Sequence, residues 1–491
     1  MTIPANGSAT LRPVGTEHDV DPQHSIGLRD AGFPLAEGAC LSGWLQGVRR
    51  DPLIDFRSSK ELPQEADAVV IGSGATGTLV ALELLKSNLH RKVILLEARE
   101  FCSGATGRNA GHCRPDIWRG YVKYSQEFGK EQAMKILANE QETYDKLKAY
   151  IMENKVDCEA WFGNTLDVMT TDDIVAAAAR NMDAFKDAGG DASGVDVILD
   201  PEQAEKVSRV KGARAVYGWN AATLYPWKLV AHVVQEALNL GLQLHTWTPV
   251  SAVEGVQDSS DWNVKTSRGI IRTPMVVHAT NAYAPALLPE TKGAIEPVPH
   301  MCNRVYPPPA FAGSSALKNS YCIIFPDGNY TVNPRQGGDG LLLVGGTPPN
   351  LQHLLDYVAE DPVTRSVDDG LINFDPVTQS VKRLGGEKGF GWDVNGFGNK
   401  AFYDHSWSGI IGESADMLPF IGAVPRKPGQ WICAGHNGHG MARIFTCAPG
   451  LVQLINGGDW ASTGLPECFE VSEGRLLAGR AKVALRLESA Y

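Results

Sequence analysis

One short glycine motif, set between two apolar runs, restricts the fold of this chain more than any other feature. Residues 66–72 (Ala-Asp-Ala-Val-Val-Ile-Gly) form a β-branched run that ends at glycine and predicts a buried strand. Residues 75–87 carry leucines at helical spacing, and residues 92–98 (Lys-Val-Ile-Leu-Leu-Glu-Ala) predict a second buried strand. Strand, helix and strand within about 35 residues predict a βαβ unit, whose crossover makes the two strands parallel.

The glycines of this motif, Gly72, Gly74 and Gly77, follow the spacing G-x-G-x-x-G at the point where the strand gives way to the helix. Such glycines permit a tight turn, bring a pyrophosphate close to the backbone and let helix pack on strand. With 52 glycines in 491 residues, chance alone produces the pattern about 0.6 times per chain, so its context decides. Glu97 ends the second strand, where a carboxylate accepts ribose hydroxyls and disfavours a 2′-phosphate. The alternative is a solvated strand-end glutamate, but the surrounding βαβ pattern favours a bound dinucleotide.

The overall composition indicates a globular protein of two or three domains. Hydrophobic residues make up 43% of the chain and charged residues 21%, which is close to globular averages. A formal charge of -11 disfavours nucleic acid and anionic lipid as partners, because both need a basic face. We expect a cytoplasmic protein, because the sequence shows no membrane span, no secretory signal and no C-terminal peroxisomal tripeptide. Nine scattered cysteines without a C-x-x-C pair predict neither a disulfide framework nor a zinc site.

Further elements follow along the chain. Residues 1–60 show little periodicity, and we expect an arm that lies on the surface. Helical periodicity recurs at 130–155, 172–189 and 227–240; a strand is predicted at 243–250, and a hairpin-like stretch at 262–277. The Pro- and Gly-rich strands between about 290 and 400 predict an antiparallel sheet.

Three separated motifs then resemble one family. The glycine-rich loop 103–112 (Ser-Gly-Ala-Thr-Gly-Arg-Asn-Ala-Gly-His) follows the second strand, residues 407–422 form a long apolar strand, and residues 435–441 (Gly-His-Asn-Gly-His-Gly-Met) form a glycine turn before a helix at 441–455. Together they resemble the D-amino-acid-oxidase-like family of FAD proteins, most closely its glutamylputrescine-oxidase-like branch. The glycine turn can also be read as an ordinary strand-to-helix connection. In the family reading, its free N–H groups stabilise the negative charge of a reduced flavin.

The resemblance implies an α/β fold with two domains: a Rossmann-like FAD-binding domain and a substrate domain built on an antiparallel sheet. We assign 61–120, 205–285 and 405–491 to the discontinuous FAD-binding domain, and 121–204 and 286–404 to the substrate domain. Motif and resemblance together predict these cofactor-binding residues: Gly72, Gly74, Ala75, Thr76, Gly77, Glu97, Ala98, Arg99, Gly104, Ala105, Thr106, Gly107, Arg108, Asn109, Gly111, Val250, Ala279, Thr280, Asn281, Gly438, His439, Gly440 and Met441.

The chain departs from the family at two positions. Several relatives attach FAD through a cysteine about seven residues before the equivalent of Asp416, where this chain has Gly409. We therefore expect FAD to be bound without a covalent link. Some relatives carry a lysine that speeds the reaction of the flavin with oxygen. The corresponding position in this chain lies near Thr331 and Val332, where there is no lysine. The electron acceptor, O2 or another, is therefore left open.

The resemblance implies oxidation of a CH–NH or CH–NH2 group in a small amine, imino acid or amino acid, with hydride transfer to flavin N5. Such chemistry asks mainly for positioning. His112, Tyr330 and Arg335 are the candidate catalytic residues, Arg335 as a bidentate partner of a substrate carboxylate. The alternatives are a structural histidine bonded to backbone for His112 and a surface ion pair for Arg335. We expect no metal, since the His436 and His439 pair lacks acidic or cysteine ligands in a matching pattern. Two alternatives stay open: desaturation or oxidative cyclisation of a larger secondary metabolite, and a redox-silent FAD-binding structural protein.

Overall fold

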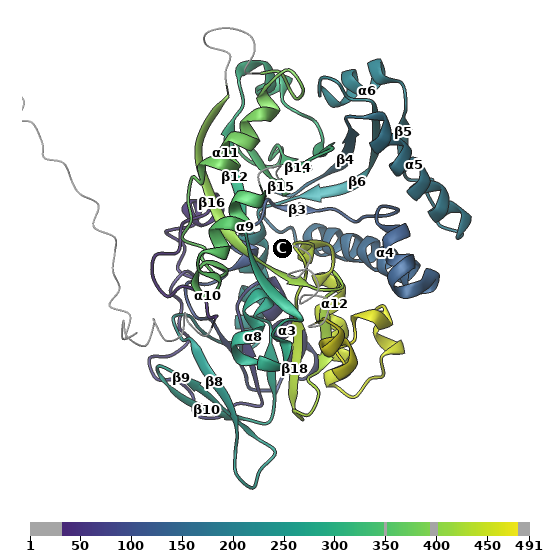
Figure 1. Cartoon of the computed structure of the whole chain (residues 1–491). Helices are drawn as coiled ribbons and strands as arrows, with labels where there is room; N and C mark the ends of the chain where they lie inside the picture. Colours follow the sequence, from purple (N-terminus) through teal and green to yellow (C-terminus); the bar gives the residue numbers. More distant parts are fainter. Residues whose placement is uncertain (1–31, 348–350, 393–400, 480–491) are drawn as a thin grey trace, which may run out of the picture.

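The computed structural model describes residues 32–347, 351–392 and 401–479, which form three sheets with helices around them. Figure 1 shows the strands β12, β14, β15, β4 and β6 in the upper half of the view, with β18 and the helices α3 and α8 (Ala284–Leu287) below. The two large sheets therefore form separate parts of the molecule. The combination confirms the predicted α/β class with a Rossmann-like part and a second, largely antiparallel part.

The six-stranded sheet contains the predicted βαβ unit. β1 (Ala68–Ile71) and β2 (Val93–Leu96) run parallel, and every residue of both strands is buried, as their continuous apolar runs predict. Helix α3 (Ala75–Ser87) joins them over the predicted residues. The strand order is β17-β18-β11-β1-β2-β7, in which the remaining strands are β7 (Gln243–His245), β11 (Val276–His278), β17 (Phe420–Ala423) and β18 (Gln430–Ala434).

The single strand predicted at 243–250 is wrong. β7 ends at His245 in the six-stranded sheet, and β8 (Val250–Gly255) begins a separate three-stranded sheet with β9 (Trp262–Thr266) and β10 (Gly269–Thr273). Trp247 adopts a left-handed φ of 50°, and Pro249 has no N–H to donate, so the strand is interrupted between the two. The predicted hairpin is present as β9 and β10, whereas β11 leaves it to pair with β1 and β18.

The nine-stranded sheet confirms antiparallel strands between 290 and 400 and extends beyond them. Its order is β16-β12-β15-β14-β13-β4-β6-β3, with β5 also paired to β6, and the contact of β4 with β13 is parallel. β6 falls within the segment 205–285 that we assigned to the other domain, so the sheets do not follow that boundary. The strands are β3 (His112–Cys113), β4 (Trp161–Met169), β5 (Asp196–Ile198), β6 (Ala215–Thr223), β12 (Ile295–Tyr306), β13 (Ser320–Phe325), β14 (Gly328–Asn333), β15 (Leu342–Thr347) and β16 (Phe402–Ser414).

The helices follow the predicted periodicity with two differences at their starts. α4 begins at Tyr121, earlier than predicted, and contains a kink at Gly129 (φ 83°), where glycine tolerates the left-handed backbone. α12 begins at Ile444, because residues 440–442 form a tighter 3-10 turn before it. The longer helices are α4 (Tyr121–Glu153), α5 (Asp172–Asp187), α6 (Pro201–Ser208), α7 (Pro226–Asn239), α9 (Leu351–Ala359), α11 (Asp375–Lys382) and α12 (Ile444–Ile455). Within the described ranges, none is long and apolar enough to cross a membrane.

The N-terminal segment departs from the expectation of a surface arm. Of residues 1–60, the part from residue 32 is described, and it contains the short helix α2 (Gly43–Gly47). Trp44 and Leu45 are each only 1% exposed and belong to the largest apolar core. Burying two large side chains is strongly favourable, so this segment is an integral part of the fold.

Candidate functional site

One cavity of about 890 Å³ is lined from both large sheets. Gly72 and Thr76, at the turn from β1 into α3, lie at one side, and Thr331 and Gly345 of the nine-stranded sheet lie at another. The loop 103–112 and the turn 436–442 complete the wall. A cavity of this size, mostly apolar with a few polar groups, is typical of a site for a small ligand or cofactor.

The glycine turn at β1 and α3 accepts no side chain at two positions. Gly72 has a φ of 103°, which L side chains rarely adopt. A Cβ on Gly77 would lie 1.9 Å from the carbonyl oxygen of Gly72. The sequence motif is therefore required by the close packing of this turn.

The first turn of α3 faces the cavity, and its N-cap residue has no side chain to cap it. Its N-cap residue is Gly74, and the backbone N–H of Ala75 donates to Oγ1 of Thr106 at 3.0 Å. That bond ties the loop 103–112 to the helix start. A helix N-terminus that lacks a side-chain cap attracts an anionic group such as a phosphate.

Glu97 is held at the end of β2 in an orientation suited to a ligand. One carboxylate oxygen accepts hydrogen bonds from N–H and Oγ of Ser73, at 2.9 and 2.8 Å, and the other from the N–H of Arg99 at 3.1 Å. Glu97 also lines the cavity. A carboxylate has about four lone-pair sites, so it retains capacity to accept from a hydroxyl group.

Most of the predicted cofactor-binding residues come together on this cavity. Gly77, Gly107 and Gly111 are not in its wall, and each shapes the backbone behind it: a Cβ on Gly107 would lie 2.2 Å from the carbonyl oxygen of Cys102. The predicted residues in the wall are Gly72, Gly74, Ala75, Thr76, Glu97, Ala98, Arg99, Gly104, Ala105, Thr106, Arg108, Asn109, Val250, Ala279, Thr280, Asn281, Gly438, His439, Gly440 and Met441.

Several polar atoms of the wall have no hydrogen-bond partner among the described residues. They include Oγ1 of Thr280, Nδ1 of His436 and both ring nitrogens of His112. Buried polar atoms normally find partners, so such orphans indicate where a polar ligand binds. With the glycine turn and the helix start, they fit a dinucleotide cofactor.

His112 is the predicted catalytic residue that the structure places in the cavity wall. It lies on β3, where burial and the nearby Arg114 lower the pKa of its ring to about 3. The imidazole is therefore neutral at physiological pH, with one nitrogen able to donate and the other to accept.

Tyr330 and Arg335 lie away from the cavity, which corrects their prediction as catalytic residues. Tyr330 is 1% exposed and its hydroxyl lies 2.6 Å from Oγ of Ser380, in a separate apolar cluster. Arg335 pairs with Glu159 at 2.7 Å and lies over the ring of Trp44. Successive side chains of a strand point to opposite faces, and on β14 it is Thr331 that lines the cavity.

The wall also contains polar residues that sequence reasoning missed. Arg114 is 6% exposed, stacks on Trp219 and pairs with Asp167. Arg114 follows His112 by two residues, so strand alternation offered a signal for it. Glu296 and Glu413 face one another across β12 and β16, a pairing that only the register reveals. The missed polar residues in the wall include Arg114, Arg119, Glu296, His300, Thr331, Glu413, His436 and Asn437.

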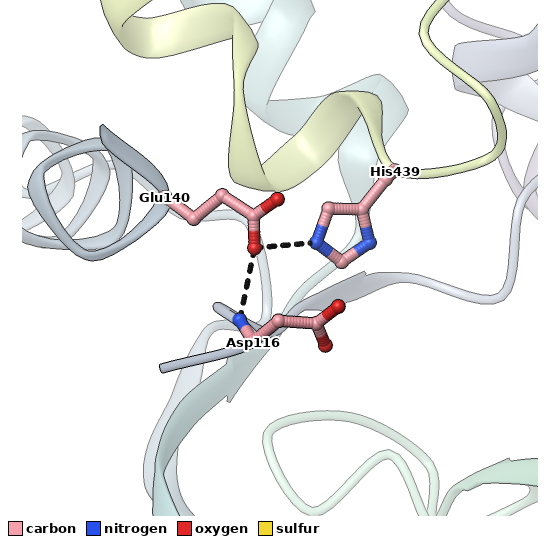
Figure 2. A group of neighbouring side chains, drawn as sticks. All are labelled: Asp116, Glu140 and His439. Atoms are coloured by element: carbon pink, nitrogen blue, oxygen red, sulfur yellow. Dashed lines mark hydrogen bonds and ion pairs between the residues drawn. The ribbon is translucent and has the colours of Figure 1, made fainter. Parts of the chain in front are cut away.

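His439 belongs to a partly buried cluster with Asp116 and Glu140 that the sequence did not indicate (Figure 2). Its Nε2 lies 3.0 Å from one carboxylate oxygen of Glu140, and the backbone N–H of Asp116 donates to the same oxygen. Burial raises the pKa of Glu140, but its interactions with His439 and with the positive charge of Arg443 lower it by more. The pKa of Glu140 therefore lies below its ordinary value.

The geometry of this cluster is also compatible with a metal ion, since ligand atoms of its three residues lie within 4.8 Å of one another. Arginines already compensate both carboxylates, however. Arg443 donates to the second oxygen of Glu140 at 3.0 Å, and Arg119 donates to Asp116 at 2.6 Å. The arrangement supports a network that orients the turn before α12, and it gives no reason to propose a metal.

A parallel sheet with a glycine turn, a held glutamate and a large shared cavity defines a dinucleotide-binding oxidoreductase fold. The family model described as "FAD dependent oxidoreductase" matches residues 67–454. The chain therefore belongs to this family, the DAO family of FAD-dependent oxidoreductases, and its cofactor is FAD.

Relatives agree with this assignment. The chain is 22% identical over 404 residues to the Haemophilus influenzae protein named "Probable oxidoreductase OrdL", covering 81% of this chain and 84% of that protein. It is 23% identical over 396 residues to gamma-glutamylputrescine oxidoreductase of Escherichia coli, covering 80% and 84%. The crystal structure of glycine oxidase from Geobacillus kaustophilus superposes with a TM-score of 0.65 at 19% identity, covering 83% of this chain and 99% of that one. The predicted resemblance to the family and its glutamylputrescine-oxidase-like branch is confirmed.

Proposed function

We propose that this FAD-dependent oxidoreductase oxidises a C–N bond of a small amine, imino acid or amino acid. The observation that carries the proposal is a continuous cavity that joins the turn at Gly72 to His112 and the nine-stranded sheet. The relatives named above include an oxidoreductase of gamma-glutamylputrescine and an oxidase of glycine. When bound, FAD would accept a hydride from the carbon next to the substrate nitrogen.

The cofactor residues predicted from the sequence remain our proposal for the FAD site. The turn at Gly72 and the start of α3 would hold the pyrophosphate, and Glu97 the ribose hydroxyls. Gly438 and Met441, before α12, would lie near the ring. In the same proposal, the segments 61–120, 205–285 and 405–491 form the FAD-binding domain, although β6 pairs with the other sheet.

We also propose that FAD is held without a covalent link. Gly409 occupies the place of the linking cysteine and lines the cavity. A Cβ there would lie 2.9 Å from Cβ of Arg108, so the backbone leaves no room for a cysteine without displacement. Denaturation with acid should release all of the flavin into solution.

Substrate positioning falls to the residues of the nine-stranded sheet and of β3. Neutral His112 would accept a hydrogen bond from the substrate amine, which keeps the nitrogen lone pair oriented for oxidation. Nε of Arg114 is buried and has no partner within the described part of the chain, so it would donate to a substrate carboxylate. Gly345, paired with Thr331 on the neighbouring strand, has no side chain and would leave space for the substrate on the cavity side of the sheet.

An anaerobic screen tests the proposal. The purified holoprotein is mixed with amines, imino acids and amino acids, and the visible flavin absorbance is followed. Bleaching by at least one of these compounds is the expected result. No bleaching by any of them, with bleaching by dithionite, would overturn amine oxidation and favour a larger substrate or a redox-silent role. Admitting oxygen afterwards and assaying peroxide identifies O2 as the acceptor.

A further inference from the structure

Three consecutive backbone carbonyls of the cofactor loop (residues 103–111) accept hydrogen bonds from side chains outside it. The carbonyls of residues 107–109 accept, in chain order, from the Ser42 hydroxyl, from Nε1 of Trp407 at 2.7 Å and from Nε1 of Trp44 at 2.6 Å. Two of these donors precede residue 67, where the family match begins. The loop is therefore held in part by residues that lie outside the family match.

The same N-terminal segment packs tightly on the glycines of the loop. A Cβ on Gly111 would lie 2.9 Å from the ring of Trp44, and one on Gly107 would lie 3.4 Å from a methyl carbon of Leu45. Trp44 and Leu45 are each 1% exposed. Because Gly107 and Gly111 lie behind the cavity wall, this contact supports the loop from its far side.

A buried ion pair fastens the other end of the segment. Asp369, fully buried between α10 (Pro362–Arg365) and α11, pairs with Arg99 at 2.8 Å. Its carbonyl oxygen accepts from the N–H of Cys40 at 2.8 Å, and Nη1 of Arg99 donates to the carbonyl of Leu35 at 3.3 Å. Arg108, in the loop itself, also donates to the Asp369 carbonyl.

We propose that residues 33–45, together with Asp369, form a clasp that holds the loop 103–111 in its FAD-binding conformation and so slows loss of the cofactor. The proposal rests on the assignment of this loop to FAD. Phe33 and Pro34 line the cavity directly, so the clasp reaches the ligand as well as the loop behind it.

The physical reason is preorganisation. The loop contains three glycines, and an unsupported glycine-rich loop samples many conformations. Any conformational entropy lost on binding weakens the affinity for FAD, and fixing the loop beforehand removes that loss. Each buried hydrogen bond of the clasp should change the rate of FAD release by about tenfold.

The test measures FAD release from holoprotein. Trp44→Phe removes the N–H donor and keeps the buried ring, and Ser42→Ala removes the hydroxyl. After dilution, the recovery of free FAD fluorescence gives the release rate, which needs no substrate. We expect each variant to release FAD about tenfold faster and the double variant about 100-fold faster, with Ser42→Thr close to wild type.

A matched control separates the clasp from general stability. Nε1 of Trp460 donates to the carbonyl of Leu465 at 3.1 Å, away from the cavity, so Trp460→Phe removes a similar bond without touching the loop. If the double variant folds and releases FAD within twofold of wild type, the proposal is overturned. It is equally overturned if Trp460→Phe accelerates release as much as Trp44→Phe does. If Trp44→Phe fails to fold, the FAD release rates of Ser42→Ala and Ser42→Thr are compared instead, and equal rates would overturn the proposal.

This outcome is independent of the proposed reaction. A protein that binds FAD tightly but bleaches with no amine would contradict amine oxidation and leave the clasp standing. Rapid loss of FAD from wild type and variants alike would contradict the clasp and leave the reaction open to test with added FAD.

Discussion

The two walls of the cavity are built in different ways. The wall on the six-stranded sheet consists mainly of backbone: the glycine turn at Gly72, the start of α3 and the loop that follows β2. The wall on the nine-stranded sheet consists of side chains such as His300 and Thr331, from strands far apart in sequence. A backbone wall depends on local sequence, whereas a side-chain wall depends on which face each strand presents.

This difference explains why the wall on the six-stranded sheet tolerates few amino-acid substitutions. In the turn, a single methyl group meets a carbonyl oxygen at less than 2 Å. On the nine-stranded sheet, a Cβ on Gly345 would lie 3.4 Å from its nearest neighbour, an ordinary contact. The turn at Gly72 and Gly77 is thus sterically determined, whereas the wall on the nine-stranded sheet is crowded at Gly346 and Gly409 but has room for a side chain at Gly345.

The largest expected effect is that of Gly77→Ala. Its Cβ collides with the Gly72 carbonyl, so the turn must move, and FAD affinity should fall by roughly 100-fold or more. The visible absorbance of the purified protein measures FAD content. Gly194→Ala is the control, since a Cβ there meets nothing within 4 Å. Full FAD content in Gly77→Ala would show that the turn accommodates a side chain at residue 77 without losing FAD.

Replacing His112 tests the side-chain wall. His112→Ala should slow substrate-driven bleaching roughly 100-fold, because positioning of the amine is lost, and leave FAD content unchanged. Stopped-flow absorbance under anaerobic conditions measures the rate. The exposed His90 provides the control variant His90→Ala. An unchanged rate in His112→Ala would remove this residue from the site.

Buried neutral histidines should make the protein acid-sensitive. Burial, with Lys427 adding to it, lowers the pKa of His278 to about 4 from its ordinary 6.5. Between these values the unfolded state binds more protons, so stability is present above pH 6.5 and is lost as pH falls towards 4. His278 alone should account for about 2 kcal/mol of the loss between pH 7 and pH 5.

Urea unfolding at the two pH values measures this effect. His278→Gln is expected to lower stability at both values and to reduce the difference between them by that amount. His278 lies at the end of β11 in the six-stranded sheet. If the stability difference between pH 7 and pH 5 is the same in His278→Gln as in wild type, the acid sensitivity comes from histidines elsewhere, such as His300, whose pKa is also lowered by burial.

Tyr330→Phe should have the smallest effect and tests which face of β14 meets the cavity. Its hydroxyl bonds to Ser380 on the face away from the cavity, so its loss should cost about 1 kcal/mol of stability. The rate of flavin bleaching should remain within twofold of wild type. A large kinetic effect would contradict the strand orientation that places Thr331 in the cavity.

The nucleotide wall could be predicted from sequence because its determinants are contiguous. The βαβ unit, the limits of α3 and the position of Glu97 all follow from local patterns. The wall on the nine-stranded sheet could not be predicted, because Tyr330 and Thr331 are neighbours in sequence and face opposite sides of β14. Hydrophobic alternation on a strand buried on both faces does not reveal which side meets the cavity. Arg335 was likewise misplaced, because Glu159 is 176 residues away in sequence.

The parallel βαβ unit, the requirement for glycine at its turn and the family to which the chain belongs all follow from local sequence patterns. The three-dimensional fold was needed to show that Trp44 and Ser42 hydrogen-bond to the loop 103–111, that Glu140 holds His439 and that Arg114 lines the cavity. The cause is distance along the chain. Backbone conformation and helix ends are set within a few residues, whereas buried hydrogen bonds and ion pairs are set by which distant segments the core brings into contact.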